Sequence, residues 1–395
     1  MRLALDIAQA SMAKQGEELC GDSLEVVRRD GEIMVVLSDG LGSGVKAGIL
    51  STMTVKMAAK LLARGLPLEE TVDTINRTLP ICKVRGLAYA TLNIIHINKD
   101  NKVRLIQDDA PPAILINPSM QEVLPLRGQK KYIGGKVIFD GEFEIEEGQT
   151  LLIVSDGVPH AGVGAVLDLG WGMEGVLNYV QKKLTSIEEP EKWVEEILEV
   201  TKVLYADEPG DDATAIAIRA RKPRNLMLVS GPPSDKRLDS EFCTRLKEFN
   251  GRKVISGGAT ANMVARELKL SLQTELLYDD PSVPPIAKMA GINLVTEGIL
   301  TINKTLERLK SVLSGDILSS KKDGATLLAK ELMKSEEIFF CIGTAANPAH
   351  RALAPAITYP QRVPAFAEMV YVLERLGKYC FLGTFPSCIK LVLRR

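Results

Sequence analysis

The sequence predicts an α+β protein in which antiparallel sheets are covered by helices, followed by a smaller α/β domain. In the first half, strand-like segments follow one another directly and helical segments come in pairs. This order is typical of antiparallel sheets, because a parallel sheet requires strict strand–helix alternation. The second half repeats a rhythm of strand, Gly/Ser/Asp loop and helix, which favours an α/β sheet. We therefore expect two domains, 1–222 and 223–395.

The expected boundary is the basic, proline-containing segment 219–224, which lies between two apolar runs. The 395 residues suffice for two or three domains. The 49 basic and 50 acidic side chains nearly cancel, so no overall charge attracts nucleic acid or an anionic membrane. No apolar run is long enough to span a bilayer, and the N-terminal residues indicate a strand rather than a signal peptide.

The six cysteines include no CxxC pair and there are only three histidines, so neither a zinc cluster nor a disulfide bond is indicated. This cysteine usage is typical of the reducing cytosol. We therefore expect a cytoplasmic protein that binds neither nucleic acid nor a membrane. Any metal ion would be held mainly by oxygen.

The first expected pair of elements is a β-hairpin. Its strands are Leu24–Arg28 and Ile33–Leu37. Asp30-Gly31 between them is a strong signal for a two-residue turn. If this pair forms the centre of the turn, residues equally distant from it lie opposite each other. Apolar residues then face apolar residues, and Asp22 faces Asp39.

The other elements of the first half follow from apolar periodicity and from Gly and Pro signals. Helices are expected over Val45–Arg64, Leu68–Leu79, Met173–Leu184 and Pro190–Tyr205. Further strands are expected over Thr91–Ile97, Val103–Gln107, Ala113–Ile116, Val137–Phe139, Thr150–Ser155 and Ala213–Ile218.

Aspartates stand beside strand-like segments at four places. These are Gly21-Asp22-Ser23, Ser38-Asp39-Gly40, Ser155-Asp156-Gly157 and Gly210-Asp211-Asp212. Directly opposed β-residues have Cβ atoms about 4.5–5.5 Å apart, so Asp22 and Asp39 would repel each other unless a cation lay between them. Antiparallel pairing of the strands beside Asp156 and Asp211 would bring these acids together as well. Such a site suits Mg²⁺ or Mn²⁺, although any single Asp could be a turn or strand-end cap.

At these residues the sequence resembles the metal-dependent protein phosphatases of the PPM or type 2C family, in the bacterial SpoIIE-like branch. The matching stretches cover roughly residues 1–220. They are the four aspartate motifs together with Leu41–Gly44, Thr74–Leu79, Val158 and Ala213-Thr214. The resemblance implies an α-β-β-α sandwich of two antiparallel sheets flanked by helices, with two Mn²⁺ or Mg²⁺ ions at one end.

The resemblance also implies roles for individual residues. Asp22 and Asp39 would bind or bridge the metal ions, and Gly40 would offer its backbone carbonyl. Asp156 and Asp211 would bind on the other side. Asp212, beside the last ligand, would complete the metal site and orient waters.

The expected reaction is hydrolysis of phosphoserine or phosphothreonine, in which water activated by the two ions attacks phosphorus in line. In the resembled branch the substrates are often phosphorylated anti-anti-sigma (STAS) proteins. A phosphoprotein of this kind is therefore the expected partner, in a bacterial signalling switch.

Three features fall outside the motifs. Lys14 is the nearest cation upstream of the first acid, where eukaryotic members place an arginine that holds the substrate phosphate. It could bind the substrate in that arginine's place, or it could be an ordinary solvated lysine. The segment 107–112, with two aspartates, replaces a small Gly/Ser-containing segment, and its carboxylates could be surface charges or part of the rim of the site. His160, four residues after Asp156, could bind substrate or act as a general acid, or it could be loop surface.

The second half lies outside the resemblance. Its first strands are expected over Leu226–Val229 and Lys253–Ile255, and a helix over Met263–Leu268. Between the second strand and the helix stand Gly257, Gly258, Thr260 and Asn262, a pattern that can hold a phosphate or another anion. The same pattern also suits a plain strand-to-helix turn. We expect a regulatory domain that senses a small-molecule effector or docks a protein.

Two other functions fit the sequence. The protein could be a catalytically inactive signalling scaffold, a pseudophosphatase, although four like charges kept together without need are costly. Loss of metal binding would favour the scaffold. It could also be a small-molecule phosphoesterase, which comparable activity on nucleotides and on a phosphopeptide would favour.

Overall fold

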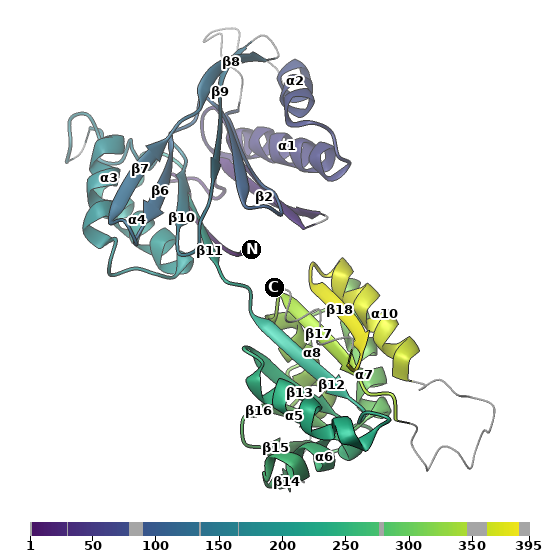
Figure 1. The fold of residues 1–395 in the computed structure, drawn as a ribbon. Coiled ribbons are helices and arrows are strands. Elements are labelled where there is room, and N and C mark those ends of the chain that lie inside the picture. The colour runs from purple at the N-terminus through teal and green to yellow at the C-terminus, as the bar shows by residue number, and fades with distance from the viewer. Residues whose placement is uncertain are drawn as a thin grey trace. The chain divides into compact units, whose positions relative to one another are not determined.

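The structure is a computed structural model that describes residues 2–29, 31–78, 90–133, 136–164, 166–275, 280–345 and 362–386. The chain divides into two compact units, Met1–Lys222 (unit 1) and Pro223–Arg395 (unit 2). Figure 1 shows their elements. In the described ranges, every helix is too short or too polar to cross a membrane.

Unit 1 is a sandwich of two antiparallel sheets, with strand orders β1-β11-β10-β6-β7 and β2-β3-β4-β5-β9-β8. The first sheet consists of β1 (Ala4–Met12), β6 (Ala113–Asn117), β7 (Glu122–Leu126), β10 (Thr150–Val154) and β11 (Ala213–Arg221). The second consists of β2 (Asp22–Arg29), β3 (Glu32–Asp39), β4 (Leu92–Ile97), β5 (Lys102–Asp108), β8 (Gln129–Ile133) and β9 (Lys136–Glu144). The predicted α+β class with antiparallel sheets is confirmed.

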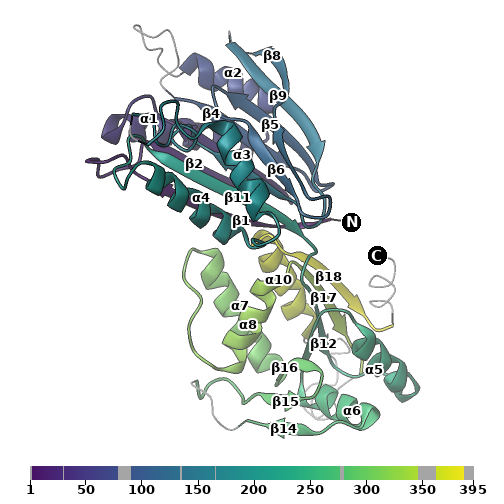
Figure 2. The ribbon, with the colours of Figure 1, turned by 90° about the vertical axis from the view of Figure 1, so that its left-hand side faces the viewer.

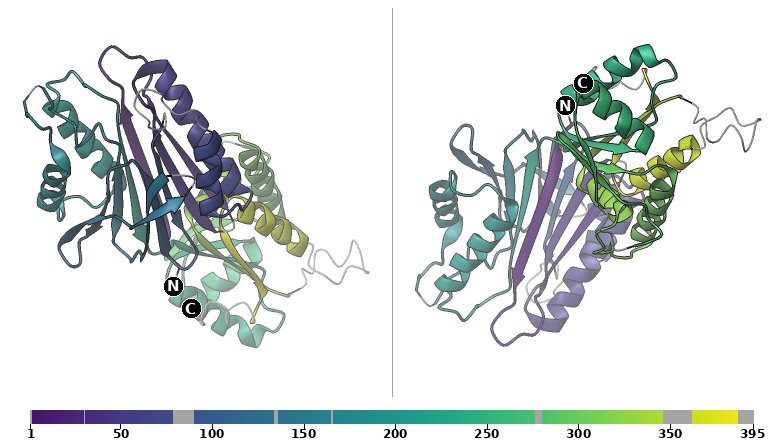
Figure 3. Two further views of the ribbon diagram at one scale, coloured as in Figure 1. Left: turned by 90° about the horizontal axis from the view of Figure 1, so that it is seen from above. Right: turned by 90° about the horizontal axis from the view of Figure 1, so that it is seen from below.

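Helices cover both outer faces of the sandwich, as the views in Figure 3 show. They are α1 (Gly44–Ala63), α2 (Leu68–Thr78), α3 (Gly172–Lys183) and α4 (Pro190–Leu204). The first pair packs on the six-stranded sheet and the second pair on the five-stranded sheet. Between the sheets lie branched side chains such as Val35, Ile95, Ile153 and Ile216, which are fully buried. Burial of these side chains stabilises the sandwich and holds its two sheets face to face.

Two strands of unit 1 were missing from the sequence prediction. Strands β7 and β8 lie at sheet edges, and most of their side chains are partly or fully exposed. Edge strands of this kind often carry Pro and Lys, here Pro125, Lys130 and Lys131. They therefore show no clear apolar alternation to detect.

Unit 2 contains a seven-stranded sheet in the order β14-β15-β16-β13-β12-β17-β18. Its strands are β12 (Asn225–Ser230), β13 (Arg252–Ser256), β14 (Leu272–Thr274), β15 (Ala287–Met289), β16 (Ile292–Thr296), β17 (Glu337–Ile342) and β18 (Tyr379–Thr384). Five neighbouring strands of this sheet, β16, β13, β12, β17 and β18, are parallel to one another. Strand β15 is antiparallel to both of its neighbours, β14 and β16. In chain order the parallel strands run 3-2-1-4-5, which is the order of a doubly wound α/β sheet. The predicted α/β class is confirmed.

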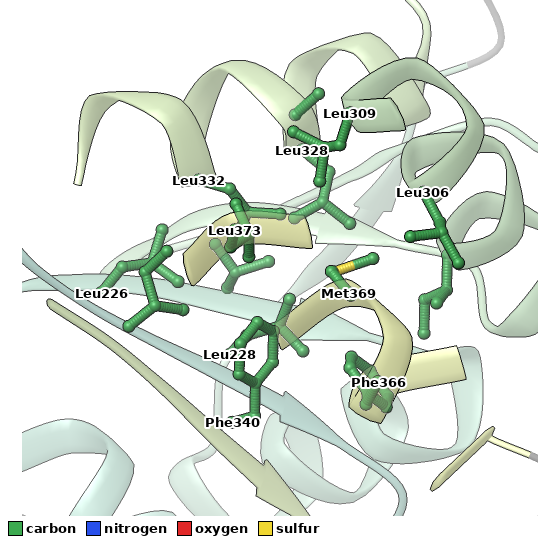
Figure 4. Packing of buried hydrophobic residues seen from close by; sticks show 14 of the residues in the cluster. Leu226, Leu228, Leu306, Leu309, Leu328, Leu332, Phe340, Phe366, Met369 and Leu373 are labelled. Carbon is green, nitrogen blue, oxygen red and sulfur yellow. The ribbon is translucent and has the colours of Figure 1, made fainter. Parts of the chain in front are cut away.

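Helices cover both faces of this sheet (Figure 2). They are α5 (Asp239–Glu248), α6 (Gly258–Leu268), α7 (Ile299–Leu313), α8 (Gly324–Lys334) and α10 (Arg362–Arg375), with a short 3₁₀ turn η1 (Lys236–Leu238) before α5. Figure 4 shows the core under α7, α8 and α10, where Leu228 and Phe340 of the sheet meet Met369.

Cys341 in β17 is disulfide-bonded, which the cysteine spacing in the sequence did not indicate. Cys20, Cys243 and Cys380 are free thiols.

Candidate metal centre

The β2–β3 hairpin places two aspartates side by side at one end of the sandwich. Asp22 is paired with Asp39 and Val26 with Val35, so the predicted register is confirmed. A shift by one residue would turn the apolar side chains to the other face of the strand. The apolar pairs therefore fix the position of the acids.

The five-stranded sheet brings two more aspartates to this end. Strands β10 and β11 are antiparallel, with Val154 opposite Ala215, so Asp156 after β10 lies near Asp211 before β11. One ligand atom each from Asp156, His160 and Asp211 lies within 4.8 Å of the others. Asp39 lies close enough to Asp156 and Asp211 that both side chains raise its pKa. The structure thus brings together acids from both sheets.

Ser155 links Asp22 to the other sheet. The Ser155 hydroxyl donates to Asp22 Oδ2 at 2.7 Å and accepts from the Thr214 N–H at 2.8 Å. Asp22 Oδ1 is buried and has no hydrogen-bond partner among the described residues. An ionised oxygen in that position is costly to bury unless a cation or a donor satisfies it.

Asp212 fixes the loop between β1 and β2. Its Oδ1 accepts from the Lys14 N–H at 3.0 Å, while its Oδ2 is buried without a partner among the described residues. The Asp212 N–H in turn donates to Asp211 Oδ1 at 3.0 Å. The charge of Lys14 lies close enough to lower the pKa of Asp211, although burial and Asp156 raise it more.

Two glycines allow backbone segments to approach at the site. A Cβ on Gly40 would lie 2.2 Å from the carbonyl oxygen of Ala47 in α1. A Cβ on Gly157 would lie 2.0 Å from the carbonyl oxygen of Asp212. Only glycine fits at such distances. The glycine after Asp39 therefore lets α1 approach that acid, and the glycine after Asp156 lets the Asp212 backbone approach the other.

Two side chains that sequence reasoning missed hold the acids through the backbone. Thr91 N–H donates to the Asp39 carbonyl at 2.8 Å, and Thr91 Oγ1 accepts from the Asp39 N–H at 3.0 Å. Tyr205, at the end of α4, donates its hydroxyl to the Gly157 carbonyl at 3.0 Å. Both contacts link residues far apart in sequence, so no local sequence pattern predicts them.

A small cavity of about 10 Å³ adjoins Asp39 and Asp156. Asn93 and Asp109 also line it, and both polar atoms of the buried Asn93 side chain lack a hydrogen-bond partner among the described residues. The volume corresponds to about one water molecule. Asp109 thus lies at the rim of the site, whereas Asp108 pairs with Lys136 at 2.9 Å.

The negative charges of these acids repel one another. Burial raises the pKa of Asp39 far above its ordinary range, and the charges of Asp22, Asp156 and Asp211 raise it further. Burial also raises the pKa of Asp22 to about 6, against the opposing hydrogen bonds from Thr214 and Ser155. A divalent cation would relieve this repulsion and meet the unpaired oxygens. The residues therefore fit a metal centre.

Without metal ions, we expect unit 1 to become less stable as the pH rises. The pKa values of Asp22 and Asp39 are raised on folding, so the native state binds protons more tightly than the unfolded state. Their stabilising contribution is complete below the ordinary aspartate value of 3.8. It is lost as the pH rises through the folded pKa, about 6 for Asp22 and higher for Asp39.

This pH dependence can be followed by tryptophan fluorescence, because both tryptophans of the chain, Trp171 and Trp193, lie in unit 1. In chelator, the melting temperature should fall between about pH 5 and about pH 8. Mn²⁺ should remove most of the decline. A melting temperature that rises over this range in chelator would contradict the placement of the acids.

Replacing Ser155 by alanine should loosen the centre. Ser155→Ala removes the donor to Asp22 and the acceptor of the Thr214 N–H, so we expect a loss of about 1–3 kcal/mol in unfolding free energy. The affinity for Mn²⁺ should fall as well. Ser186→Ala, in the exposed turn that follows α3, is the control and should change stability by less than about 0.5 kcal/mol. Equal behaviour of both variants in denaturant melts would refute the role of Ser155.

Unit 1 is similar to proteins of the SpoIIE family. Residues 29–221, which lie within unit 1, match the family model of Stage II sporulation protein E (SpoIIE). Stage II sporulation protein E of Bacillus subtilis (strain 168) is 26% identical over 154 residues, which are 38% of this chain and 18% of that protein. The match thus spans less than a fifth of the length of this curated relative.

Solved structures are also similar to the chain. The PP2C phosphatase domain of SpoIIE from Bacillus subtilis, with a fragment of its regulatory domain, has a TM-score of 0.48 at 20% identity and covers 56% of this chain and 63% of its own. The structure of the RsbU and RsbW domains of Rv1364c from Mycobacterium tuberculosis has a TM-score of 0.47 at 15% sequence identity. The match covers 62% of this chain and 70% of that chain. The structure of RsbX in complex with magnesium has a TM-score of 0.40 at 22% sequence identity. The match covers 55% of this chain and 95% of that chain.

In the candidate anion site of unit 2, the helix starts earlier than the sequence predicts. Helix α6 begins at Gly258 rather than at Met263, because Gly258 and the small residues after it form its first turn. The Thr260 hydroxyl is buried and accepts from the Gly231 N–H at 2.7 Å, and Asn262 is an exposed residue of the helix. A Cβ on Gly258 would lie 3.3 Å from a carboxylate oxygen of Glu297. An acid thus already stands beside this helix N-terminus, where Gly257 precedes the first turn.

Proposed function

We propose that unit 1 is a metal-dependent protein serine/threonine phosphatase. Two Mn²⁺ or Mg²⁺ ions would be held by Asp22, Asp39, the Gly40 carbonyl, Asp156, Asp211 and Asp212. The observation that carries the proposal is the convergence of acids from both sheets, with unpaired carboxylate oxygens at its centre. The match of residues 29–221 to the SpoIIE family model supports it further.

When bound, the ions supply an activated water and neutralise the phosphoryl oxygens. The chain's own residues hold this centre in place. Ser155 and Thr91 fix Asp22 and Asp39, so the carboxylates need not reorganise during the reaction. Lys14, whose charge acts on Asp211, would attract the substrate phosphate.

The proposed substrate is a phosphoprotein of the anti-anti-sigma (STAS) type, within a cytoplasmic signalling switch. The resemblance of the motifs supports this part. We further propose that residues 223–395 regulate unit 1 by sensing a small-molecule effector or by docking a protein. The doubly wound sheet supports the sensing role, since such sheets bind ligands at the carboxyl edge of their strands.

The test is hydrolysis by the full chain of an aryl phosphate, a phosphoserine peptide and a nucleoside monophosphate, with Mn²⁺, with Mg²⁺ and with chelator. We expect metal-dependent turnover of the aryl phosphate and of the peptide. Equal turnover of the nucleotide would indicate a small-molecule phosphoesterase instead. A folded protein that binds metal poorly and turns over none of the three would be a scaffold.

A further inference from the structure

His160 occupies a position from which its ring can share an ion with two aspartates. Its Nδ1 lies 3.7 Å from Asp156 Oδ2, and a ring nitrogen, an Asp156 oxygen and an Asp211 oxygen all lie within 4.8 Å of one another. Ligand atoms about 2.0–2.2 Å from a common ion are separated by about 3 Å when adjacent and by about 4 Å when opposite. The 3.7 Å between His160 Nδ1 and Asp156 Oδ2 falls in this range, and the limit of 4.8 Å on the other pairs lies close to it.

The turn that carries His160 is anchored to the core. The His160 N–H donates to the Asp156 carbonyl at 3.0 Å, which turns both side chains toward the same side. Val158 and Ala161, on either side of His160, are fully buried. The Tyr205 hydroxyl holds the Gly157 carbonyl from α4. The histidine side chain itself is 58% exposed, so its ring can turn to present either nitrogen.

We propose that His160 is a third protein ligand of the ion held by Asp156 and Asp211, and that it makes this ion a first-row transition metal such as Mn²⁺ in preference to Mg²⁺. Imidazole nitrogen suits transition metals, whereas Mg²⁺ prefers oxygen ligands in an octahedral arrangement. A neutral ring also adds a ligand without adding negative charge to a centre already crowded with carboxylates. The inference rests on the proposed metal centre and assigns His160 to the metal rather than to the substrate.

The test is pulsed EPR of the untagged full chain, stripped with chelator and loaded with Mn²⁺. A coordinated imidazole gives a nitrogen hyperfine coupling, which His160→Gln should abolish. His96→Gln is the matched control, because His96 lies in β4 and pairs with Glu32 at 2.8 Å; this variant should keep the coupling. In metal titrations, His160→Gln should weaken Mn²⁺ binding at least about tenfold and Mg²⁺ binding less than threefold.

His160→Glu provides a second arm, because it replaces nitrogen by oxygen at the same place. The ratio of Mn²⁺ to Mg²⁺ affinity should fall relative to the unsubstituted protein. Absence of nitrogen coupling in the Mn²⁺-loaded protein, or equal loss of both metals in His160→Gln, would overturn the inference. These readouts do not depend on turnover. Nitrogen coupling without hydrolysis would refute only the phosphatase, and hydrolysis without coupling would refute only the ligand role.

Discussion

Asp39→Asn should abolish turnover and stabilise the metal-free protein. Asp39 stands opposite Asp22 and close to Asp156, so its loss removes a central ligand from the proposed metal site. We expect phosphopeptide hydrolysis to fall on the order of 10²–10³-fold or more, the scale of losing one preorganised electrostatic group. In chelator, the melting temperature should rise, because one of several mutually repelling carboxyl groups becomes neutral.

The matched control is Asp140→Asn, at another buried acid of unit 1. Asp140 pairs with Arg104 and Lys131 at 2.7 and 2.6 Å, so its neutralisation should lower the melting temperature and leave Mn²⁺ affinity unchanged. The two variants should thus shift stability in opposite directions. Full activity of Asp39→Asn, or a lower melting temperature for it in chelator, would contradict the proposed centre.

Gly157→Ala should separate the ligands that the two strands bring together. The new methyl group would lie 2.0 Å from the Asp212 carbonyl oxygen, so one of the two segments must move. Overpacking of this kind costs about 1–3 kcal/mol. Because Gly157 follows Asp156 directly and the displaced carbonyl follows Asp211, Mn²⁺ affinity and turnover should fall by more than the stability loss explains. Calorimetric titration and denaturant melts measure the two quantities separately.

Gly148→Ala separates strain from ligand displacement. Gly148 has a φ of +85° and nothing within 4 Å of an added Cβ, so alanine there is strained by roughly 1–2 kcal/mol but pushes no neighbour. It precedes β10, at the opposite end of that strand from Asp156. This variant should lose stability and keep its Mn²⁺ affinity. If Gly157→Ala binds Mn²⁺ as well as Gly148→Ala does, the close approach at Gly157 has no part in forming the centre.

Much of unit 1 could be predicted from sequence because its signals are local. A strong turn pair and apolar cross-strand partners fix the hairpin register, and the register then places Asp22 opposite Asp39. The same holds for α1, whose expected start at Val45 lies one residue from the observed Gly44. The strand order could not be obtained in this way, since it depends on contacts between distant segments.

The parts of the site that escaped prediction are held by long-range contacts. Backbone atoms beside the acids are held by Thr91 and Tyr205, and Asn93 lines the small cavity next to them. Nothing in the local sequence distinguishes these three residues from ordinary strand or helix residues. The sequence does not assign Asp109 to the surface or to the rim of the site, because nothing local distinguishes it from Asp108. In unit 2, the small residues after β13 looked like a loop and instead begin α6.

The most direct test of the central claim is calorimetric titration of the chelator-stripped full chain with Mn²⁺, beside Asp39→Asn. We expect Mn²⁺ to bind the unsubstituted protein and to raise the melting temperature reported by Trp171 and Trp193, as linkage requires. Asp39→Asn should bind Mn²⁺ at least about tenfold more weakly. Equal Mn²⁺ affinity in both proteins, or no Mn²⁺ binding by the folded unsubstituted chain, would show that the converging carboxylates are not a metal centre.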